Sequence, residues 1–474
     1  MKRNNNAFLT FIVVFLTAFL SSVGIILKNQ ETSTYWFVAL LPLFFCLIIL
    51  INYRVFAKSL SMISIMLVML CYYMRMVIIP FVFVYSDYSS LIINHDYSNY
   101  IIYAVLLSIY EFFIVTTIVN CFDKKKIENV NNNDLINKNE VNNTKANKYV
   151  SIIIFILLIV VVLAFIKYPQ FQYYFRFIFE SNINKIDSYN INSRIMKETI
   201  PSITYWTIIY LIDILQILLP IVFINIIKKM RIYEGFKFIL SISIILIVVL
   251  ICTPETARSI IIAFSLCFIL IKLYPNKKRF LITSIIVLLF PSIIFGLFIK
   301  SGSSYFRNDI SNILNAYFSG VSNIATSFLI PNRPSLLLLF NDMIHSVPFV
   351  NAFFRETTTS TVLYNNLFYN SAGRYDQIIP MISQSMCYFG FLLAPIISYF
   401  SVKISLLVEN KYNCDNDIYK IYFKMIIILY FAIAPVVYNF SIIFSVFFKI
   451  IIPCFIIINF RFSKYNFKKQ KLNY

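Results

Sequence analysis

The run ITYWTIIYLIDILQILLPIVFINII (203–227), followed by KKMR (228–231), shows how this chain is built. A helix needs about 20 mostly apolar residues to cross the roughly 30 Å hydrocarbon core of a bilayer. This run exceeds that length and carries a single charge, Asp213. We therefore predict a transmembrane helix, and KKMR predicts that its C-terminal end faces the cytoplasm, because cytoplasmic loops are rich in Lys and Arg.

The same pattern recurs along the chain. Of the 474 residues, 59% are hydrophobic and only 13% are charged, which excludes an ordinary soluble domain. We predict an all-α polytopic membrane protein with about twelve transmembrane helices, forming a single integral membrane domain over 1–474. The predicted spans are 7–27, 36–52, 59–84, 99–119, 149–166, 203–227, 237–253, 259–274, 280–299, 381–402, 421–440 and 442–460.

The charges orient these helices. With the N-terminus inside, nearly all of the net charge of +20 falls on cytoplasmic segments, as the positive-inside rule expects. Both termini are then cytoplasmic, and the chain is a multi-pass protein of the cytoplasmic membrane, in contact with membrane lipid. This orientation accounts for the basic balance, so we predict no nucleic-acid partner.

Three connections are long. Residues 123–148 form an Asn- and Lys-rich, low-complexity cytoplasmic loop, which we predict to be disordered and without chemistry. The other two, 167–202 and 300–380, lie on the outer face. The larger outer loop contains apolar stretches, so we expect it to fold partly as helix.

Arginine is concentrated on the outer face. It supplies 7 of the 12 basic residues there but only 5 of the 26 inside. Topology needs only positive charge, whereas the planar guanidinium matches phosphate and carboxylate oxygens. The bias favours a polyanionic ligand such as a lipid-linked diphosphate, and local salt bridges are the alternative. The outer arginines are Arg176, Arg194, Arg258, Arg307, Arg333, Arg355 and Arg374.

The tetrad GRYD (373–376) stands directly before the predicted span 381–402. Asp376 precedes Pro380 at the outer start of that helix, where an acid commonly interacts with the helix dipole or caps the helix. The alternative is a general base at the membrane surface, beside an Arg374 that holds phosphate. The sequence leaves both interpretations open.

Two further outer features could carry chemistry. The short turn TPETARS (253–259) fixes Glu255 and Arg258 at the membrane boundary, either as a rigid site or as an ordinary polar hairpin tip. His345, in NDMIHSVPF, is a candidate base or a surface residue without a role.

Besides Lys424, four charges lie within the apolar spans: Arg75, Glu111, Asp213 and Lys449. Such residues are costly in a bilayer, and they usually pair or face a cavity. A rise of 1.5 Å per residue places all four about 12–18 Å below the outer surface. They form either a neutral paired network or the polar floor of a cavity beneath the outer loops.

Three stretches resemble the Wzy-type oligosaccharide repeat-unit polymerases, the membrane enzymes of O-antigen and capsule assembly. NAYFSGVSNIATSF (315–328) is similar to the family's Tyr-small-Gly-Asn stretch, and GRYDQIIPMISQSMCYFGFLLAPI (373–396) to the stretch that closes the large loop. TPETARSII (253–261) resembles the Arg-bearing turn between two central helices. No outer Arg is followed by a Gly eleven positions on, a spacing found in some members, which leaves the division of roles between the loops open.

The resemblance implies a glycosyltransferase that joins undecaprenyl-diphosphate-linked repeat units at the outer leaflet into a polysaccharide. It also implies flippase and chain-length regulator proteins as partners, and neither a cofactor nor a metal ion. The expected diphosphate-binding residues are Arg258, Arg374, Arg194 and Arg307. The expected catalytic residues are Asp376, His345 and Glu255.

Two other functions compete with this one. A lipid-linked oligosaccharide flippase would also need arginine for the diphosphate, but such transporters usually consist of two repeated halves with short loops. An O-antigen ligase would perform the same chemistry with a different acceptor.

Overall fold

The structure is a computed structural model in which every regular element is helical. The described part of the chain contains no strand, which confirms the all-α class. The described residues are 2–28, 35–53, 55, 62–86, 98–122, 133–172, 199–251, 256–277, 306–331, 333–350, 354, 357–372, 377–412 and 417–459.

The chain divides into two compact units, each built from separated segments. The first unit comprises Met1–Lys124, Ser303–Lys411 and Ile427–Ser445, and the second comprises Lys125–Gly302, Tyr412–Ile426 and Val446–Tyr474. The single membrane domain expected over 1–474 stays a prediction.

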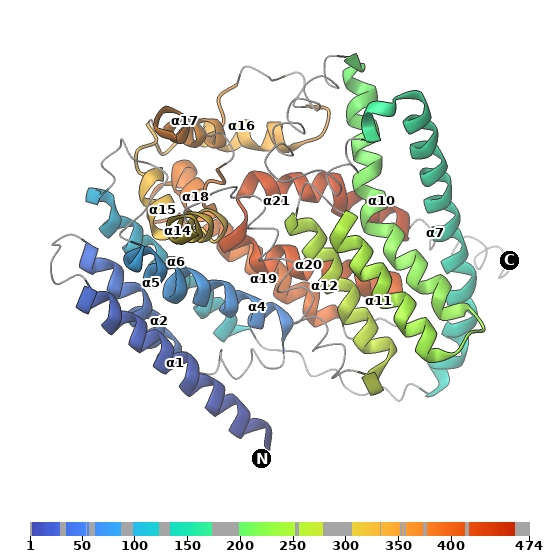
Figure 1. Ribbon diagram of the computed structural model, residues 1–474, viewed down its shortest axis with the longest axis horizontal. Coiled ribbons are helices and arrows are strands. Elements are labelled where there is room, and N and C mark those ends of the chain that lie inside the picture. The colour runs from blue at the N-terminus through green and yellow to red at the C-terminus, as the bar shows by residue number, and fades with distance from the viewer. Residues whose placement is uncertain are drawn as a thin grey trace, which may run out of the picture. The chain divides into compact units, whose positions relative to one another are not determined.

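The first unit combines the N-terminal helices with helices from the predicted large outer loop (Figure 1). Its elements are α1 (Lys2–Lys28), η2 (Tyr35–Ala39), α2 (Leu40–Ile51), α4 (Ile63–Tyr73), η3 (Met74–Ile78), α5 (Ile79–Tyr85), η4 (Ser98–Tyr100), α6 (Ile101–Cys121), α14 (Phe306–Tyr317), α15 (Val321–Ser327), α16 (Leu336–Ser346), α17 (Ser360–Ala372), α18 (Met381–Phe389), α19 (Ile396–Tyr412), the second half of α20 (Ile418–Val437) and most of α21 (Phe440–Val446).

The second unit is a row of long helices in which α7 packs on α10, α10 on α11, and α11 on α12 (Figure 1). Its elements are α7 (Asn133–Lys167), η5 (Pro169–Gln172), α10 (Ser202–Lys229), α11 (Glu234–Ile251), α12 (Thr256–Leu273), η6 (Pro275–Lys277), the first half of α20, and η8 (Phe447–Ile451) with the helical residues that follow it.

Seven of the described helices are long and apolar enough to cross a membrane, as expected of a polytopic membrane protein. Each falls on one of the twelve predicted spans. They are Thr10–Lys28, Ile63–Tyr85, Ile101–Cys121, Val150–Lys167, Ser202–Lys229, Ile418–Val437 and Phe440–Asn459.

The remaining predicted spans do not coincide with a described helix that is long and apolar enough to cross a membrane. Tyr35–Ile51 is a shorter apolar helix, and α11 and α12 cover most of the predicted 237–253 and 259–274. The predicted span 280–299 lies outside the described residues. The count of twelve and the predicted orientation stay predictions.

One predicted span is not a continuous helix. Residues 381–402 form α18 and α19, separated by the turn 390–395. Gly390 ends α18 with φ +80°, a conformation that glycine adopts without strain. Its N–H still donates to the Met386 carbonyl over 2.9 Å. Pro395 then directly precedes α19, where its fixed φ suits a helix start.

The predicted loop 123–148 is partly helical. Helix α7 begins at Asn133, so the helix predicted from residue 149 is about four turns longer at its N-terminal side. Our expectation of disorder was therefore wrong for 133–148, and residues 123–132 lie outside the described part of the chain.

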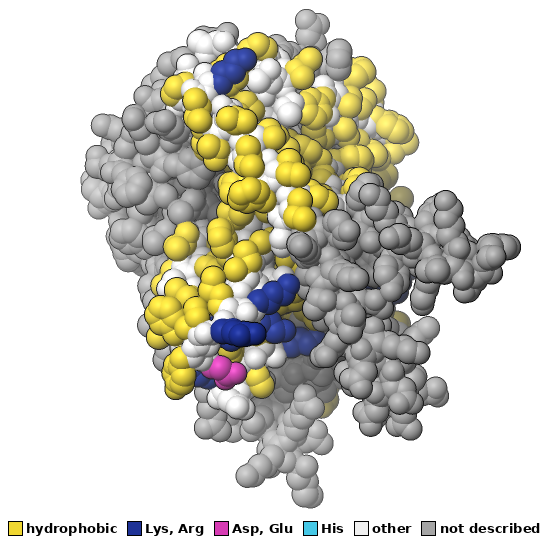
Figure 2. Space-filling view, turned by 90° about the vertical axis from the view of Figure 1, so that its right-hand side faces the viewer, with side chains coloured by type: hydrophobic (Ala, Val, Ile, Leu, Met, Phe, Trp, Pro, Cys, Tyr) yellow, Lys and Arg dark blue, Asp and Glu magenta, His cyan; other side chains and the backbone are white. Residues whose placement is uncertain are grey.

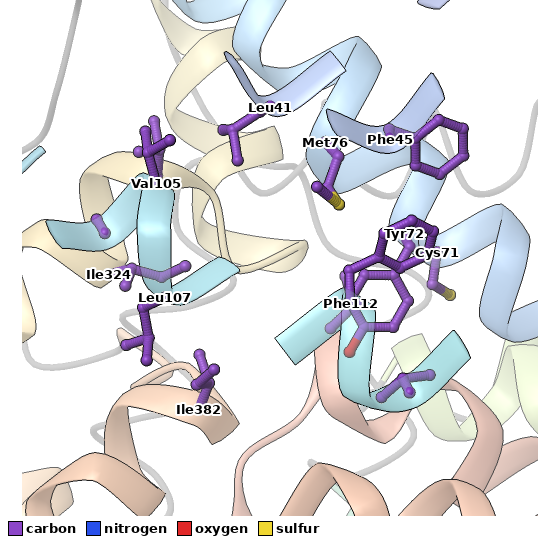
Figure 3. Packing of buried hydrophobic residues seen from close by; sticks show 14 of the residues in the cluster. Leu41, Phe45, Cys71, Tyr72, Met76, Val105, Leu107, Phe112, Ile324 and Ile382 are labelled. Atoms are coloured by element: carbon purple, nitrogen blue, oxygen red, sulfur yellow. The ribbon is translucent and has the colours of Figure 1, made fainter. Parts of the chain in front are cut away.

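The core of the first unit joins segments that are far apart in the sequence. Phe112 on α6 stacks on Phe45 of α2 and contacts Tyr72 of α4, with ring centroids 5.1 and 5.0 Å apart (Figure 3). Ile324 of α15 and Ile382 of α18 belong to the same buried cluster. The predicted large loop therefore contributes directly to the hydrophobic core.

Candidate functional site

The polar centre of the first unit lies on α16, a helix of eleven residues within the predicted large outer loop. Asp342 and His345 are three residues apart on this helix, so their side chains project from neighbouring positions of the same side. Helix α16 packs on both α17 and α18. This arrangement brings a carboxyl group and an imidazole to one region of the unit.

Asp342 is 1% exposed and is surrounded by hydrogen-bond donors. Its Oδ2 atom accepts hydrogen bonds from the hydroxyls of Ser360 on α17 and Tyr388 on α18. It also accepts from Gln384 Nε2 over 3.2 Å. Three side-chain donors converging on one oxygen suit a carboxylate, which is an acceptor only. The Asp342 carboxyl therefore ties α16, α17 and α18 together.

Gln384 extends this network to α21. Its Nε2 lies 2.7 Å from Ser441 Oγ and 2.9 Å from Ser360 Oγ, and its Oε1 accepts the N–H of Phe440 over 2.7 Å. Burial raises the pKa of Asp342, and the donors from Ser360, Tyr388 and Gln384 partly offset that rise. The resulting buried network is rigid and almost fully hydrogen-bonded.

His345 is held in one orientation. Its Nε2 lies 2.7 Å from Thr357 Oγ1, and the Thr357 hydroxyl donates to the Phe354 carbonyl over 2.9 Å. Because Thr357 has one proton to donate, its oxygen must accept from His345, so Nε2 carries the hydrogen. In the neutral imidazole, Nδ1 then holds the lone pair, and no described residue hydrogen-bonds to it.

The segment that follows the GRYD tetrad is fixed at its first residue. Asn365 of α17 accepts the N–H of Gln377 over 2.9 Å and donates to the Gln377 carbonyl over 3.0 Å. The tetrad itself, with Arg374 and Asp376, lies outside the described residues.

The stretch NAYFSGVSNIATSF (315–328) contains the end of α14, the tight turn 318–320 and all of α15. Asn315 Oδ1 accepts a hydrogen bond from the Ser322 hydroxyl over 3.0 Å. The backbone carbonyl of Asn315 accepts one from the N–H of Gly320 over 2.9 Å. A Cβ on Gly320 would lie 2.0 Å from Asn315 Oδ1. Tyr364 of α17 donates to the Asn323 carbonyl. The described contacts thus give this stretch a packing role, with Asn and Gly required for a close turn.

Two of the seven predicted outer arginines have described side chains, and both have local partners. Arg333 donates to the carbonyls of Ser327 and Phe328 at the end of α15, and its guanidinium lies 5.0 Å from the centroid of the Phe328 ring. Bonds to final helical carbonyls are typical of basic residues at a helix C-terminus.

Arg258, near the start of α12 in the second unit, is the other described arginine. It forms a buried ion pair with Asp213 of α10 and lies 3.5 Å from Gln216 Oε1. Asp213, one of the four charges predicted within the spans, thus pairs with a residue that the sequence placed at the membrane boundary. For Arg258, the described contacts favour the local salt bridge over a ligand site.

The second buried pair lies in the first unit. Arg75 Nη1 is 2.6 Å from Glu111 Oε2, and the Ser398 hydroxyl donates to Glu111 Oε1. Arg75 lies in η3, a π-helical turn directly before Pro80, and such wider turns frequently mark functional positions. Lys449 lies in a second π-helical turn, η8. Of the four charges predicted to form one network, Arg75 and Glu111 pair with each other and Asp213 pairs with Arg258 instead, while Lys449 has no ion pair among the described contacts.

The other predicted site residues lie wholly or partly outside the described part of the chain. Glu255 and Arg194, like Arg374 and Asp376, lie outside the described residues. Arg307 lies on α14, but only its backbone is described. The site roles assigned to these five residues stay predictions.

Sequence reasoning missed the central residue of the network. Asp342 stands one turn before His345 in NDMIHS, and Gln384 and Tyr388 are four residues apart in QSMCY, hence on one helix face. That spacing was visible, but nothing in the sequence showed that the two faces meet.

Among the described residues, no group of three His, Cys, Asp or Glu side chains is placed to hold a metal ion. Comparison with protein-family models, curated proteins and solved structures finds no match to this chain.

Proposed function

We propose that the protein is a membrane glycosyltransferase that polymerises undecaprenyl-diphosphate-linked oligosaccharide repeat units into a polysaccharide of the capsule or O-antigen type. In this proposal it acts at the outer leaflet of the cytoplasmic membrane. The resemblance of the three sequence stretches supplies the reaction class. The observation that carries the proposal is the pair of hydrogen bonds that orients His345, because this proposal uses the His345 imidazole as the base.

The proposed reaction forms one bond and breaks another. A hydroxyl oxygen of the incoming repeat unit attacks the anomeric carbon of the growing glycan, and the bond from that carbon to the diphosphate breaks. Undecaprenyl diphosphate leaves with the electron pair of the broken bond. The hydroxyl proton must go to a base, and a positioned side chain typically accelerates such a transfer by about 10²–10⁴-fold.

His345 is our first candidate for this base. Its Nε2–H is held by Thr357, so the neutral ring offers Nδ1 as the proton acceptor. Asp342 is a positioning residue, since its carboxylate holds α16 against α17 and α18. Asp376 and Glu255 remain alternative bases.

The departing diphosphate needs positive charge, and preorganised cations in a dry site stabilise such charge strongly. Arg374 ranks first, because it lies in one of the three stretches that resemble the polymerase family. Arg194 and Arg307 follow. Arg258 ranks last, because it would have to leave Asp213 before it could bind a phosphate oxygen.

The first test is deletion of the gene in its host, followed by sizing-gel analysis of the surface and lipid-linked glycans. We expect the polymer ladder to disappear while single repeat units still reach the outer leaflet. Repeat units trapped on the inner leaflet would instead indicate a flippase. Full-length polymer retained on undecaprenyl diphosphate would indicate a ligase, and either result would overturn the proposal.

The second test complements the deletion with variants. His345→Asn should abolish the ladder at a protein level equal to wild type, and His95→Asn is the matched control because the chain has only two histidines. Arg374→Lys keeps the charge but loses the bidentate guanidinium, so it should shorten or abolish the ladder. A normal ladder from His345→Asn would remove His345 as the base and shift that role to Asp376 or Glu255.

A further inference from the structure

One end of the second unit collects basic side chains from three helices. Helix α10 ends at Lys229, α11 begins at Glu234, and α12 ends at Leu273 before η6. Because α10 packs on α11 and α11 on α12, and successive helices run in opposite directions, these three termini lie at the same end of the row.

We name this group the basic cap. It has six cations and one acid, Glu234, in the described residues 228–237 and 272–277, so its formal charge is +5. Figure 2 shows Lys and Arg side chains gathered at one end of a hydrophobic surface. The cations of the cap are Lys228, Lys229, Arg231, Lys237, Lys272 and Lys277.

Two of the cations make contacts within the cap. Lys237 Nζ lies 3.5 Å from the Lys228 carbonyl, which links the start of α11 to the end of α10. Lys277 Nζ lies 4.5 Å from the centroid of the Phe238 ring, which also makes an edge contact with Tyr274. The cations therefore sit on a structured turn and two packed helix ends.

Apolar side chains alternate with these cations. Tyr233 is 83% exposed, and Met230, Ile232 and Phe236 are also exposed. Such a mixture is unfavourable in water but suits the boundary of a bilayer, where apolar groups reach the acyl region and cations remain at the level of the head groups.

We propose that the basic cap binds the head groups of anionic phospholipids in the adjacent leaflet. The negative phosphates match the +5 charge, and the exposed Tyr233 and Phe236 match the layer directly beneath them. Basic clusters immediately beside a transmembrane helix bind anionic lipid, and each cation strengthens binding by about fivefold. This inference is independent of the proposed glycosyltransferase activity.

The test uses the full-length protein in a neutral detergent and a fluorescent phosphatidylglycerol as the probe, with phosphatidylcholine as the uncharged comparison. The variant combines Lys228→Gln, Lys229→Gln and Arg231→Gln. The matched control, Lys403→Gln, Lys411→Gln and Lys420→Gln, removes the same charge from the segment 403–420, whose sequence holds three lysines and three acids, Glu409, Asp415 and Asp417.

The cap variant should bind phosphatidylglycerol on the order of 100-fold more weakly than wild type, and the control should bind it within about threefold of wild type. Unchanged thermal unfolding of both variants would show that they are folded. Equal losses in both variants, or no loss in the cap variant, would overturn the proposal. Competition by inorganic phosphate as strong as that by the lipid would also overturn it, because the ligand would then be a free phosphate.

Discussion

The Arg75–Glu111 pair offers the sharpest test of the structure. Arg75 is 2% exposed and Glu111 is fully buried, with 2.6 Å between Nη1 and Oε2. The Nε and Nη2 atoms of Arg75 have no hydrogen-bond partner among the described residues. If Glu111 loses its charge, no other described residue accepts a hydrogen bond from the guanidinium.

The expected cost follows from this burial. Glu111→Gln keeps the shape and an oxygen for the Ser398 hydroxyl but removes the negative charge. Removal of one partner from a buried pair typically costs about 3–5 kcal/mol. The double variant Arg75→Met with Glu111→Leu removes both charges. Its free energy of unfolding should therefore fall by less than that of Glu111→Gln or of Arg75→Met alone, and should lie within about 2 kcal/mol of the wild-type value.

The assay is unfolding of the purified protein in mixed micelles by an increasing fraction of denaturing detergent. The chain has only two tryptophans, Trp36 in the first unit and Trp206 in the second. A Trp206→Phe background therefore leaves one reporter in the unit that contains the pair. The buried pair would be refuted if each single variant lowered the free energy of unfolding by less than about 1 kcal/mol. It would also be refuted if the loss in the double variant equalled the sum of the two single losses.

Three further predictions use the same unfolding measurement. Gly320→Ala should destabilise the first unit by about 1–3 kcal/mol, because the added Cβ would lie 2.9 Å from Asn315 Cα; an unchanged midpoint would contradict the described turn. Asp213→Asn removes the carboxylate that pairs with the buried Arg258 guanidinium, so the free energy of unfolding of the second unit, read from the tryptophan of α10, should fall by about 3–5 kcal/mol; a fall under about 1 kcal/mol would argue against the pair. Burial raises the pKa of Asp342, so its stabilising contribution is complete below its ordinary value of about 3.9 and is lost as the pH rises through the folded value. Wild type should therefore lose stability relative to Asp342→Asn as the pH rises from about 4, and parallel pH profiles would show that this carboxyl does not titrate in that window.

The sequence predicted the long helices well because the bilayer imposes a length and a composition that one segment satisfies alone. The run 203–227 became α10 at Ser202–Lys229, within two residues at either end. The break after α18 was harder to predict, since GFLLAP (390–395) is almost as apolar as its flanks. Gly390 has a positive φ, and residues 391–395 form a turn before α19 begins at Ile396.

Pairings between helices could not be predicted from the sequence. Asp213 and Arg258 are 45 residues apart, and Arg75 and Glu111 are 36 apart, so which charges meet depends on which helices pack together. The Asp342 network was hidden for the same reason. It draws its members from α16, α17 and α18, and no spacing within one helix indicates the other two.

The environments of Arg258 and Arg333 change how the outer arginine bias should be interpreted. Both were counted toward a polyanion site, yet one neutralises a buried aspartate and the other binds carbonyls at a helix end. A guanidinium suits both tasks for the same reason that it suits phosphate: it offers several donors in a fixed plane. Enrichment of Arg over Lys therefore identifies places that need directed donors, whatever the acceptor. The case for a diphosphate site rests on Arg374, Arg194 and Arg307. A comparison of Arg374→Lys with Arg333→Lys tests this case without reference to composition, provided that activity and unfolding are measured separately for each variant.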